Sequence, residues 1–479
     1  MLENEVITLV RKVTEDKKET QTIETKAAHS GFPRIYDTLS SFSNQTEGGT
    51  IIFGIDENQD FEIVGTYKND IQDLQHRISE ACKQMEPEVR AVITSAEIDG
   101  KTIVAAEIPG VEFAKRPVYY KGSGIMNGSY IRVGDADEPM NEYEIYRYEA
   151  YRRRIRDDIR TVPGTSFDLL NPELVQQYLL ALKLNRTNIR NMSDDEILNL
   201  MNIRRDGLPT LSAIMSFSKY PQATFPQFCV TAVLVPGTNM GEITTDGKRF
   251  LDNKRIEGTI KEMVDGAVNF VAVNMKEQVK FDSKGNRIDV PEYPLEAVRE
   301  VILNALVHRD YSVYTEGIPV RMEMYRDRLE ISNPGGLFGM VTVDTLGRVQ
   351  SDTRNPALIS LLELMHIVEN RFSGIPTIRR LMSEAALPEP VFKDEKGMFT
   401  VVLYNAEHSA ADISLNAIQR KILEFCRMPR GRAEIAEFTG KTQYYVMKTY
   451  VEPLVQHGFL AYTKPETPKS PNQKYYTVP

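Results

Sequence analysis

The first 150 residues alternate between strand-like and helix-like hydrophobic spacing. Residues 22–26 read as a short strand, and the apolar run 51–55 reads as a buried strand that delivers Asp56 at its end. Helical spacing occurs in two stripes: Ile35, Leu39 and Phe42, and then Ile71, Leu74, Ile78 and Cys82. Further strands are expected at 90–98, 102–108 and 129–133. This mixture predicts an α+β domain over residues 1–150.

The pattern changes after residue 150. A charged connector runs to Val162, Pro163 and Gly164, which is typical of a domain boundary. Residues 172–290 combine three helical segments with a strand at 229–236, and 295–306 carry a further helical stripe. We therefore expect a linker at 151–171, a second domain at 172–405 and a third at 412–479, so that the fold class is α+β multidomain.

The last segment has helix–helix–helix–hairpin spacing. Gly440 marks a break after the second helix, and Pro453 is expected to bend the third. The pattern resembles a winged helix, in which the third helix enters the major groove. Residues 411–479 hold ten lysines and arginines against six aspartates and glutamates. The resemblance places the exposed readers at Gln443, Tyr444 and Lys448, although winged helices also serve as protein-docking modules.

Composition narrows the class of protein. At 479 residues the chain is too long for one core, and it is 41% hydrophobic with a formal net charge of -9. The acidic balance argues against a chain that coats nucleic acid throughout, but local basic surfaces remain compatible with it. No apolar run approaches a membrane span, no signal-peptide pattern is present, and three scattered cysteines fit a reducing compartment. We expect a cytoplasmic protein.

Three early carboxylates carry candidate chemistry. Glu24 and Lys26 share a face of one strand, and a carboxylate for a metal beside an ammonium for phosphate suits phosphodiester cleavage. Strict alternation places Glu19 on the other face, so it joins Glu24 and Asp56 only if the chain turns near residues 20–22. Three carboxylates together would bind Mg²⁺ or Mn²⁺. The alternative is that they are solvated surface groups.

Basic and aromatic residues flank these carboxylates. Lys115, Arg116 and Lys121 interleave with two tyrosines, as a phosphate-tracking and base-stacking surface would. An edge strand with buried tyrosines explains the same pattern. The arginines at 152–160 are interrupted by Asp157 and Asp158, which favours a salt-bridged helix over a nucleic-acid arm.

Three runs in this region resemble the Schlafen-type AlbA-like family. They are ETQTIETK, LSSFSNQTEGGTIIFGID and GSYIRVGDADEPMNEYEI, in that order. The resemblance implies nucleic-acid binding over about residues 1–150, with Arg132 of the YIRVG run as a further contact. It also implies that a metal-binding trio of the Schlafen ribonucleases maps onto Glu19, Glu24 and Asp56, with Lys26 at the motif lysine. Thr20 and Thr25 depart from the usual serine and phenylalanine.

A second group of motifs lies in the middle domain. Glu300 and Asn304 are four residues apart on a predicted helix and therefore share a face. The pair could orient water and coordinate Mg²⁺ beside a triphosphate, or lie on an exposed helix edge. The following HRD, residues 308–310, is interpreted as a structural network that caps the helix, where a cation suits the C-terminal dipole.

The runs PLEAVREVILNALVHRDYS, NPGGL, RNP and FSGIP resemble the gyrase, histidine-kinase and MutL superfamily of ATP-binding domains, in the diverged branch related to the RecG C-terminal region. The resemblance implies an ATP-binding α/β sandwich of the Bergerat type. Carried over, Glu300 and Asn304 are the helix pair, with Asn304 on Mg²⁺, and the site is lined by Asn333, Gly335, Gly336 and Gly374. Asn333 and Pro334 replace the usual adenine-binding aspartate motif, so ATP or another nucleotide is expected to bind with Mg²⁺ rather than be hydrolysed.

Together these features predict a nucleic-acid-binding protein with a metal-dependent nuclease domain that acts on RNA such as tRNA, or on DNA. A nucleotide-binding domain would regulate it, and anti-phage defence would suit that design. The alternatives are a non-catalytic, ATP-binding transcriptional regulator and an adaptor that scaffolds oligomers. The expected partners are nucleic acid, nucleotide and further copies of the chain, with no membrane.

Overall fold

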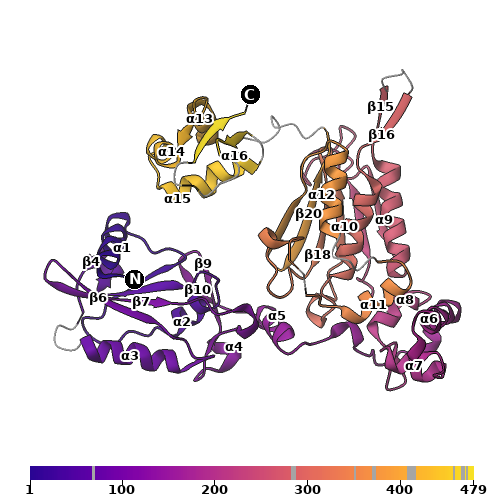
Figure 1. The fold of residues 1–479 in the computed structure, drawn as a ribbon, viewed down its shortest axis with the longest axis horizontal. Coiled ribbons are helices and arrows are strands. Elements are labelled where there is room, and N and C mark those ends of the chain that lie inside the picture. The colour runs from indigo at the N-terminus through magenta and orange to yellow at the C-terminus, as the bar shows by residue number, and fades with distance from the viewer. Residues whose placement is uncertain are drawn as a thin grey trace.

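A computed structural model describes residues 1–66, 71–281, 287–349, 352–368, 374–406, 417–456, 459–464, 470 and 473–478 (Figure 1). Side chains of 277–281, 287–289, 417 and 456 are outside this description. Among the described residues, no helix combines the length and the apolar content needed to cross a bilayer. All three cysteines are buried and free.

The first domain is built on a four-stranded sheet in the order β1-β2-β7-β6. Its strands are β1 (Ile23–Lys26), β2 (Gly49–Phe53), β6 (Val92–Ile98) and β7 (Lys101–Ile108). β1 and β2 are parallel and the other pairs are antiparallel. Three helices pack on this sheet: α1 (Glu3–Asp16), α2 (Tyr36–Ser43) and α3 (Ile71–Lys83). The predicted strands and helices of this domain are confirmed within a few residues.

Alternation along β2 divides the domain into two cores. Ile51 and Phe53 join the core beneath α2 and α3, whereas Ile52 faces the core beneath α1. A strand buried on both faces needs apolar residues at every position, which explains the unbroken run. The run stops at Gly54 because its φ of +109° ends the strand. Ile55 and Asp56 then form β3, which pairs with β4 (Glu62–Ile63).

Short elements complete the first domain and lead into the second. They are β5 (Met85–Glu86), β8 (Tyr119–Tyr120), α4 (Gly124–Gly128), β9 (Tyr130–Val133), β10 (Ala136–Pro139) and α5 (Glu142–Arg152). A capping box at Asn141 and Glu144 starts α5, which connects the two domains in Figure 1. α5 ends at Arg152, so the later arginines of the basic run lie outside a helix, contrary to the prediction.

The second domain begins with a helical region and continues into a six-stranded sheet of order β14-β13-β17-β18-β20-β19. The strands are β13 (Val230–Leu234), β14 (Asp252–Ile256), β17 (Val320–Met324), β18 (Arg328–Pro334), β19 (Val391–Glu395) and β20 (Met398–Tyr404). The helices are α6 (Pro172–Asn185), α7 (Asp194–Leu200), α8 (Leu211–Phe217), α9 (Ile260–Asn274), α10 (Leu295–Val307), α11 (Pro356–Leu364) and α12 (Gly374–Glu384). The remaining pairs are β11 (Arg204–Arg205) with β12 (Leu208–Pro209), and β15 (Glu277–Phe281) with β16 (Arg287–Pro291).

One core unites the helical region with the sheet. Buried residues of α6, α8, α9, α10 and α11 and the inward side chains of β13, β17 and β18 belong to the same cluster. Figure 1 shows α9, α10 and α12 together beside the sheet. The predicted apolar face of α10 is confirmed at Val298, Ile302 and Leu306, which are all buried.

The C-terminal unit consists of helices and a three-stranded sheet, β21-β23-β22. Its elements are α13 (Ala417–Phe425), β21 (Arg430–Gly431), α14 (Arg432–Thr439), α15 (Gln443–Val446), the π-helical turn η9 (Met447–Val451), α16 (Glu452–Gln456), β22 (Leu460–Tyr462) and β23 (Lys474–Thr477). Gly440 ends α14 with a φ of +65°. The third helix is interrupted by the π-turn just before Pro453, which lacks an N–H for the helical ladder. Most of the predicted wing lies outside the described residues.

Candidate functional sites

A tight turn brings Glu19 back to the first strand. Thr20 and Ile23 exchange two backbone hydrogen bonds of 3.2 and 3.3 Å across it. Glu19 Oε1 then accepts from the backbone N–H and the hydroxyl of Thr25, at 2.7 and 2.8 Å. The turn that the sequence required near residues 20–22 is therefore present, and Glu19 lies beside Glu24.

Arg132 lies at the centre of this carboxylate group. Its Nη2 is 2.8 Å from Glu24 Oε2 and 3.8 Å from Glu19 Oε2, and its Nη1 is 2.8 Å from Asp137 Oδ1. Lys26 forms a second ion pair with Glu24. Two cations thus balance three carboxylates in a largely buried network.

Burial, together with the adjacent Glu24 carboxylate, raises the pKa of Glu19 to about 7. For Lys26, burial acts in the opposite direction, but its hydrogen bond to Glu24 and the surrounding carboxylates raise its pKa. Near neutral pH Glu19 is therefore about half protonated, while Lys26 is charged.

The Asp56 carboxylate makes its hydrogen bonds apart from Glu19 and Glu24. Its carboxylate caps a 3-10 turn, η1 (Glu57–Gln59), and accepts from Asn58 N at 3.0 Å and Gln59 Nε2 at 2.7 Å. These hydrogen bonds, the one from Gln59 foremost, lower the pKa of Asp56. Within the described part of the chain, no three His, Cys, Asp or Glu side chains are grouped so that they could hold a metal ion. Asp56 thus does not complete a ligand set with Glu19 and Glu24 in this arrangement.

The predicted nucleic-acid residues divide by burial. The Arg132 side chain is 1% exposed, and Arg116 is buried with Nε donating to Val111 O at 2.7 Å. Both predictions of a surface contact are wrong in this conformation, because each guanidinium is used inside the domain. Lys115 and Lys121 are exposed, and each pairs with a glutamate at 3.2 and 3.7 Å.

The predicted C-terminal readers lie on the surface. Gln443 and Tyr444 are exposed, Tyr444 by 69%. Lys448 Nζ lies 5.6 Å from the Tyr444 ring centre, one turn further along the helical stretch. The three side chains are accessible to a partner, and which partner they contact stays a prediction.

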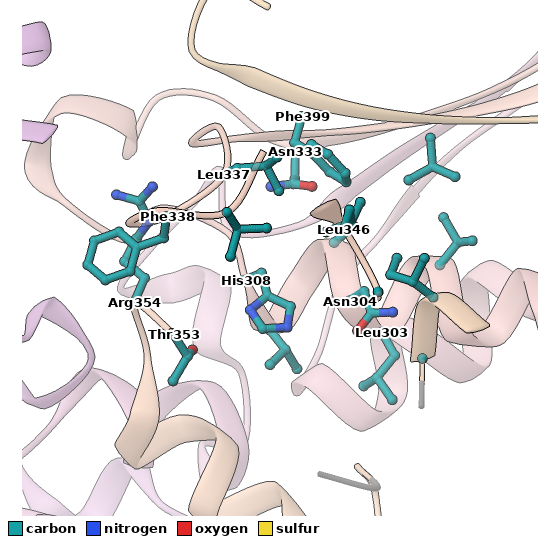
Figure 2. A pocket seen from close by; sticks show the side chains of 18 of the residues that line it. Leu303, Asn304, His308, Asn333, Leu337, Phe338, Leu346, Thr353, Arg354 and Phe399 are labelled. Atoms are coloured by element: carbon teal, nitrogen blue, oxygen red, sulfur yellow. The ribbon is translucent and has the colours of Figure 1, made fainter. Parts of the chain in front are cut away.

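The second domain encloses a cavity of about 380 Å³ beside α10. All six residues predicted to bind a nucleotide line it: Glu300, Asn304, Asn333, Gly335, Gly336 and Gly374. Apolar side chains such as Leu303, Leu346 and Phe399 make up much of the rest (Figure 2). Segments separated by up to 74 residues thus meet at one concave surface of the size that small-molecule sites have.

Glu300 and Asn304 share a face of α10, as their spacing predicts. Asn304 Nδ2 donates to Glu300 Oε1 at 3.1 Å. Gly374 begins α12 directly against them, since a Cβ there would lie 2.3 Å from Glu300 Oε1 and 3.0 Å from Asn304 Nδ2. A glycine at 374 therefore keeps this polar corner open.

The HRD segment at the end of α10 has two roles. Arg309 is 1% exposed, donates to Thr315 O at 2.8 Å and stacks on Phe228, while Asp310 is fully buried, so both are structural as predicted. His308 ends the helix, but its imidazole lines the cavity (Figure 2). The side chain is exposed, so His308 faces the cavity and solvent and is not part of the buried network formed by the other two residues.

Two family models match the chain. Residues 19–141 match the family described as "Schlafen, AlbA_2", and residues 317–403 match "Putative ATP-dependent DNA helicase recG C-terminal". The chain joins a Schlafen domain to a RecG-related C-terminal domain. The Schlafen match includes Glu19, Glu24 and Asp56, and the RecG-related match includes β17, β18 and the Gly335–Gly336 turn.

Two solved structures are similar to the chain. A crystal structure of a Corynebacterium diphtheriae protein is 17% identical, covers 93% of this chain and 92% of its own, and has a TM-score of 0.40. A solution structure of the N-terminal domain of a RecG-related protein from Nitrosomonas europaea is 23% identical, covers 28% of this chain and 92% of its own, and has a TM-score of 0.23. No curated protein matches the chain.

Sequence reasoning missed several residues around the RecG-related cavity. Arg354, 5% exposed, lines the cavity, donates to Gly336 O at 3.1 Å and pairs with Asp310 at 3.3 Å. Phe338 also lines the cavity, and its ring lies 4.7 Å from the Arg354 guanidinium. The RNP run identified the segment but not this residue, because the partner of an arginine cannot be read from its neighbours in sequence.

Proposed function

We propose that the chain is a nucleic-acid-binding protein that binds a nucleotide in the cavity of its RecG-related domain. The observation that carries the proposal is the convergence of Glu300, Asn304, Asn333, the glycine turn at 335–336 and Gly374 on one cavity. These residues come from three separate segments, α10, the run 333–336 and the start of α12, so only the fold of the domain brings them together.

The lining fits a nucleotide in size and chemistry. Four glycines in the lining allow a ligand to approach the backbone, and apolar side chains offer a surface for a base. Asn304 and Glu300 would hold Mg²⁺, which supplies charge neutralisation for the phosphates. Asn333 stands where an aspartate would accept from adenine, so an amide replaces a fixed negative charge. We propose binding without efficient hydrolysis for this reason.

The Schlafen domain supplies the nucleic-acid side of the proposal. Its lysines Lys115 and Lys121 are exposed and make surface ion pairs, and Lys121 also donates to Lys83 O at 3.0 Å. Phosphate can replace such surface ion pairs at little cost. The C-terminal unit, with the helix order of a winged helix, presents Tyr444 and Lys448 as a second contact. Duplex or structured nucleic acid could thus be bound by both ends of the chain.

Cleavage by the Schlafen domain is the second candidate. Two adjacent carboxylates, one with its pKa raised to about 7, favour it because a divalent cation would relieve their mutual repulsion. The present arrangement does not fit a metal, however, since Arg132 and Lys26 already balance these charges and Asp56 is occupied elsewhere. A non-catalytic binder is therefore the function that the geometry supports best.

One set of assays separates these functions. Labelled tRNA, single-stranded RNA and duplex DNA are incubated with the full chain and Mn²⁺, and both binding and cleavage are followed. Retained binding without cleavage is the expected result. Cleavage that Glu24→Gln abolishes, and that the exposed control Glu3→Gln retains, would establish the nuclease instead. Absence of binding to all three nucleic acids would contradict the proposed function.

A further inference from the structure

Helix α5 links the Schlafen domain to the wall of the cavity. It begins at Asn141 and lies between the two domains (Figure 1). Its Arg147 and Tyr151 lie beside Gly336 and Gly339 in the segment 336–339, and Arg154, just beyond its end, pairs with Asp352 in the segment 352–354. Both segments contribute residues to the cavity lining. One wall therefore has the cavity on one side and the connecting helix on the other.

A polar chain crosses this wall. The Tyr143 hydroxyl of α5 donates to Asp310 Oδ2 at 3.0 Å, and Arg354 Nη1 donates to the same oxygen at 3.3 Å. Arg354 Nη2 continues to Gly336 O at 3.1 Å, and the buried Arg354 Nε has no hydrogen-bond partner among the described residues. Since Arg354 lines the cavity, two hydrogen bonds connect a cavity residue to Tyr143 of α5.

An aromatic chain runs in parallel. Phe113 of the Schlafen domain packs edge-on against Tyr151 of α5 with ring centres 5.4 Å apart, and Tyr151 packs edge-on against Phe338 at 5.3 Å. Gly339 allows this approach, because a Cβ there would lie 2.5 Å from the Tyr151 ring. Phe338 is a cavity residue, so this chain joins the Schlafen domain to the lining through one ring.

The connector after α5 is tied to the same region. Arg154 pairs with Asp352, a cavity residue, and the buried Asp158 accepts from the N-terminal N–H groups of α11 at Ala357, 2.6 Å away, and Leu358, 3.3 Å away. Such a helix-capping carboxylate fixes the connector to the RecG-related domain. The linker is thus held along its length rather than left as a flexible tether.

We propose that α5 couples the two ligand sites, so that nucleotide in the cavity changes the affinity of the Schlafen domain for nucleic acid, and the reverse. The proposal rests on the proposed function for the identity of the two ligands. A ligand that contacts Gly336, Phe338 or Arg354 must hold or displace the groups that seat Tyr143 and Tyr151. By thermodynamic linkage, the factor by which nucleotide changes the affinity for nucleic acid must equal the factor by which nucleic acid changes the affinity for nucleotide.

The test measures both ratios in the full chain. Binding of a fluorescein-labelled RNA stem-loop is followed by anisotropy with and without saturating ATP and Mg²⁺, and ATP binding is followed by calorimetry with and without that RNA. We expect a change of about fivefold or more, equal in the two directions. The variant Tyr143→Phe, which removes the hydroxyl that donates to Asp310, is expected to reduce this ratio toward one while each ligand still binds alone.

The matched control is Tyr148→Phe, which removes a hydroxyl from the same helix and leaves both chains of contacts in place. It should keep the wild-type ratio. Hydrogen exchange of residues 142–152, compared with α6, should change when ATP is added. If both ligands bind but neither ratio differs from one, the coupling is refuted while the proposed function stands. If ATP does not bind, the proposed function and the coupling fail together. Equal ratios in the two tyrosine variants would exclude the α5 route.

Discussion

Arg132 is the residue that makes the carboxylates of the Schlafen domain compatible with a buried position. It is nearly inaccessible and contacts Glu24 and Asp137 at 2.8 Å, and Phe42 through its ring face. Removing one partner of such a network leaves the others charged and desolvated. This destabilises the fold by more than the intact ion pair stabilises it.

We therefore expect Arg132→Met to lower the free energy of unfolding by about 3–5 kcal/mol. Chemical denaturation of the full chain, followed by a probe in the first domain, measures this change. The control Lys115→Met removes a surface ion pair and should change stability by less than about 0.5 kcal/mol. Similar losses in the two variants would mean that Arg132 is not the centre of the network.

Glu19 adds a pH dependence with a definite sign. Its pKa is raised from the ordinary 4.5 to about 7 in the folded chain, so folding favours the protonated form. The stability associated with this shift is complete below about pH 4.5 and is lost as pH rises through about 7. Glu19→Gln imitates the protonated group. Its free energy of unfolding relative to wild type should therefore increase between pH 5 and pH 8.

The comparison is made by urea denaturation at the two pH values, with Glu15→Gln on the exposed face of α1 as the control. A relative stability of Glu19→Gln that stays constant, or falls, between pH 5 and pH 8 would show that Glu19 ionises freely in the folded domain.

These residues also show what sequence can predict at this scale. The turn at 20–23 was required by the spacing of Glu19 and Glu24, and it is present. The sequence predicts surface contacts for Arg116 and Arg132, because a sequence gives charge but not burial, and the structure buries both. The Schlafen resemblance grouped Glu19 with Glu24, which lie together, but it also included Asp56, which caps a separate turn. It could not assign Arg132 as the counter-charge of the two glutamates.

At the scale of elements, periodicity was the more reliable guide. Four-residue spacing placed Glu300 and Asn304 on one face of α10, and the stripe beneath them is buried. The C-terminal helix deviates where backbone chemistry intervenes, since a π-turn precedes Pro453. That stretch nevertheless presents Tyr444 and Lys448 on the outside.

If this helix contacts nucleic-acid phosphates, Lys448→Ala should reduce the slope of log affinity against log salt concentration by about 0.9 for duplex DNA. The slope is measured by fluorescence anisotropy between about 50 and 200 mM salt, because phosphate contacts change the affinity strongly over this range. Lys421→Ala, on the exposed side of α13, is the control and should leave the slope unchanged. An unaltered slope in the Lys448 variant would assign the unit to protein docking.

At the scale of the whole molecule, the cavity and the connecting helix depend on contacts between distant segments. The six residues that the motif resemblance predicted for a nucleotide site all line the cavity. The wall contacts of Tyr143, Tyr151 and Arg354 were not predictable, because each joins residues that are more than 40 positions apart and carries no local pattern. Motifs thus identified residues of the cavity, and only the fold revealed the contacts between the cavity wall and the connecting helix.

The most direct test of the account is calorimetric titration of the full chain with ATP and Mg²⁺. We predict one nucleotide per chain, and at least about tenfold weaker binding in Gly374→Val, a loss of about 1.4 kcal/mol, because a side chain at 374 displaces Glu300 and fills the polar corner. Gly241→Val, at a glycine with open space around it, should bind as wild type does. Absence of binding by the wild-type chain, or equal affinities in the two variants, would contradict the central claim that this cavity is a nucleotide site.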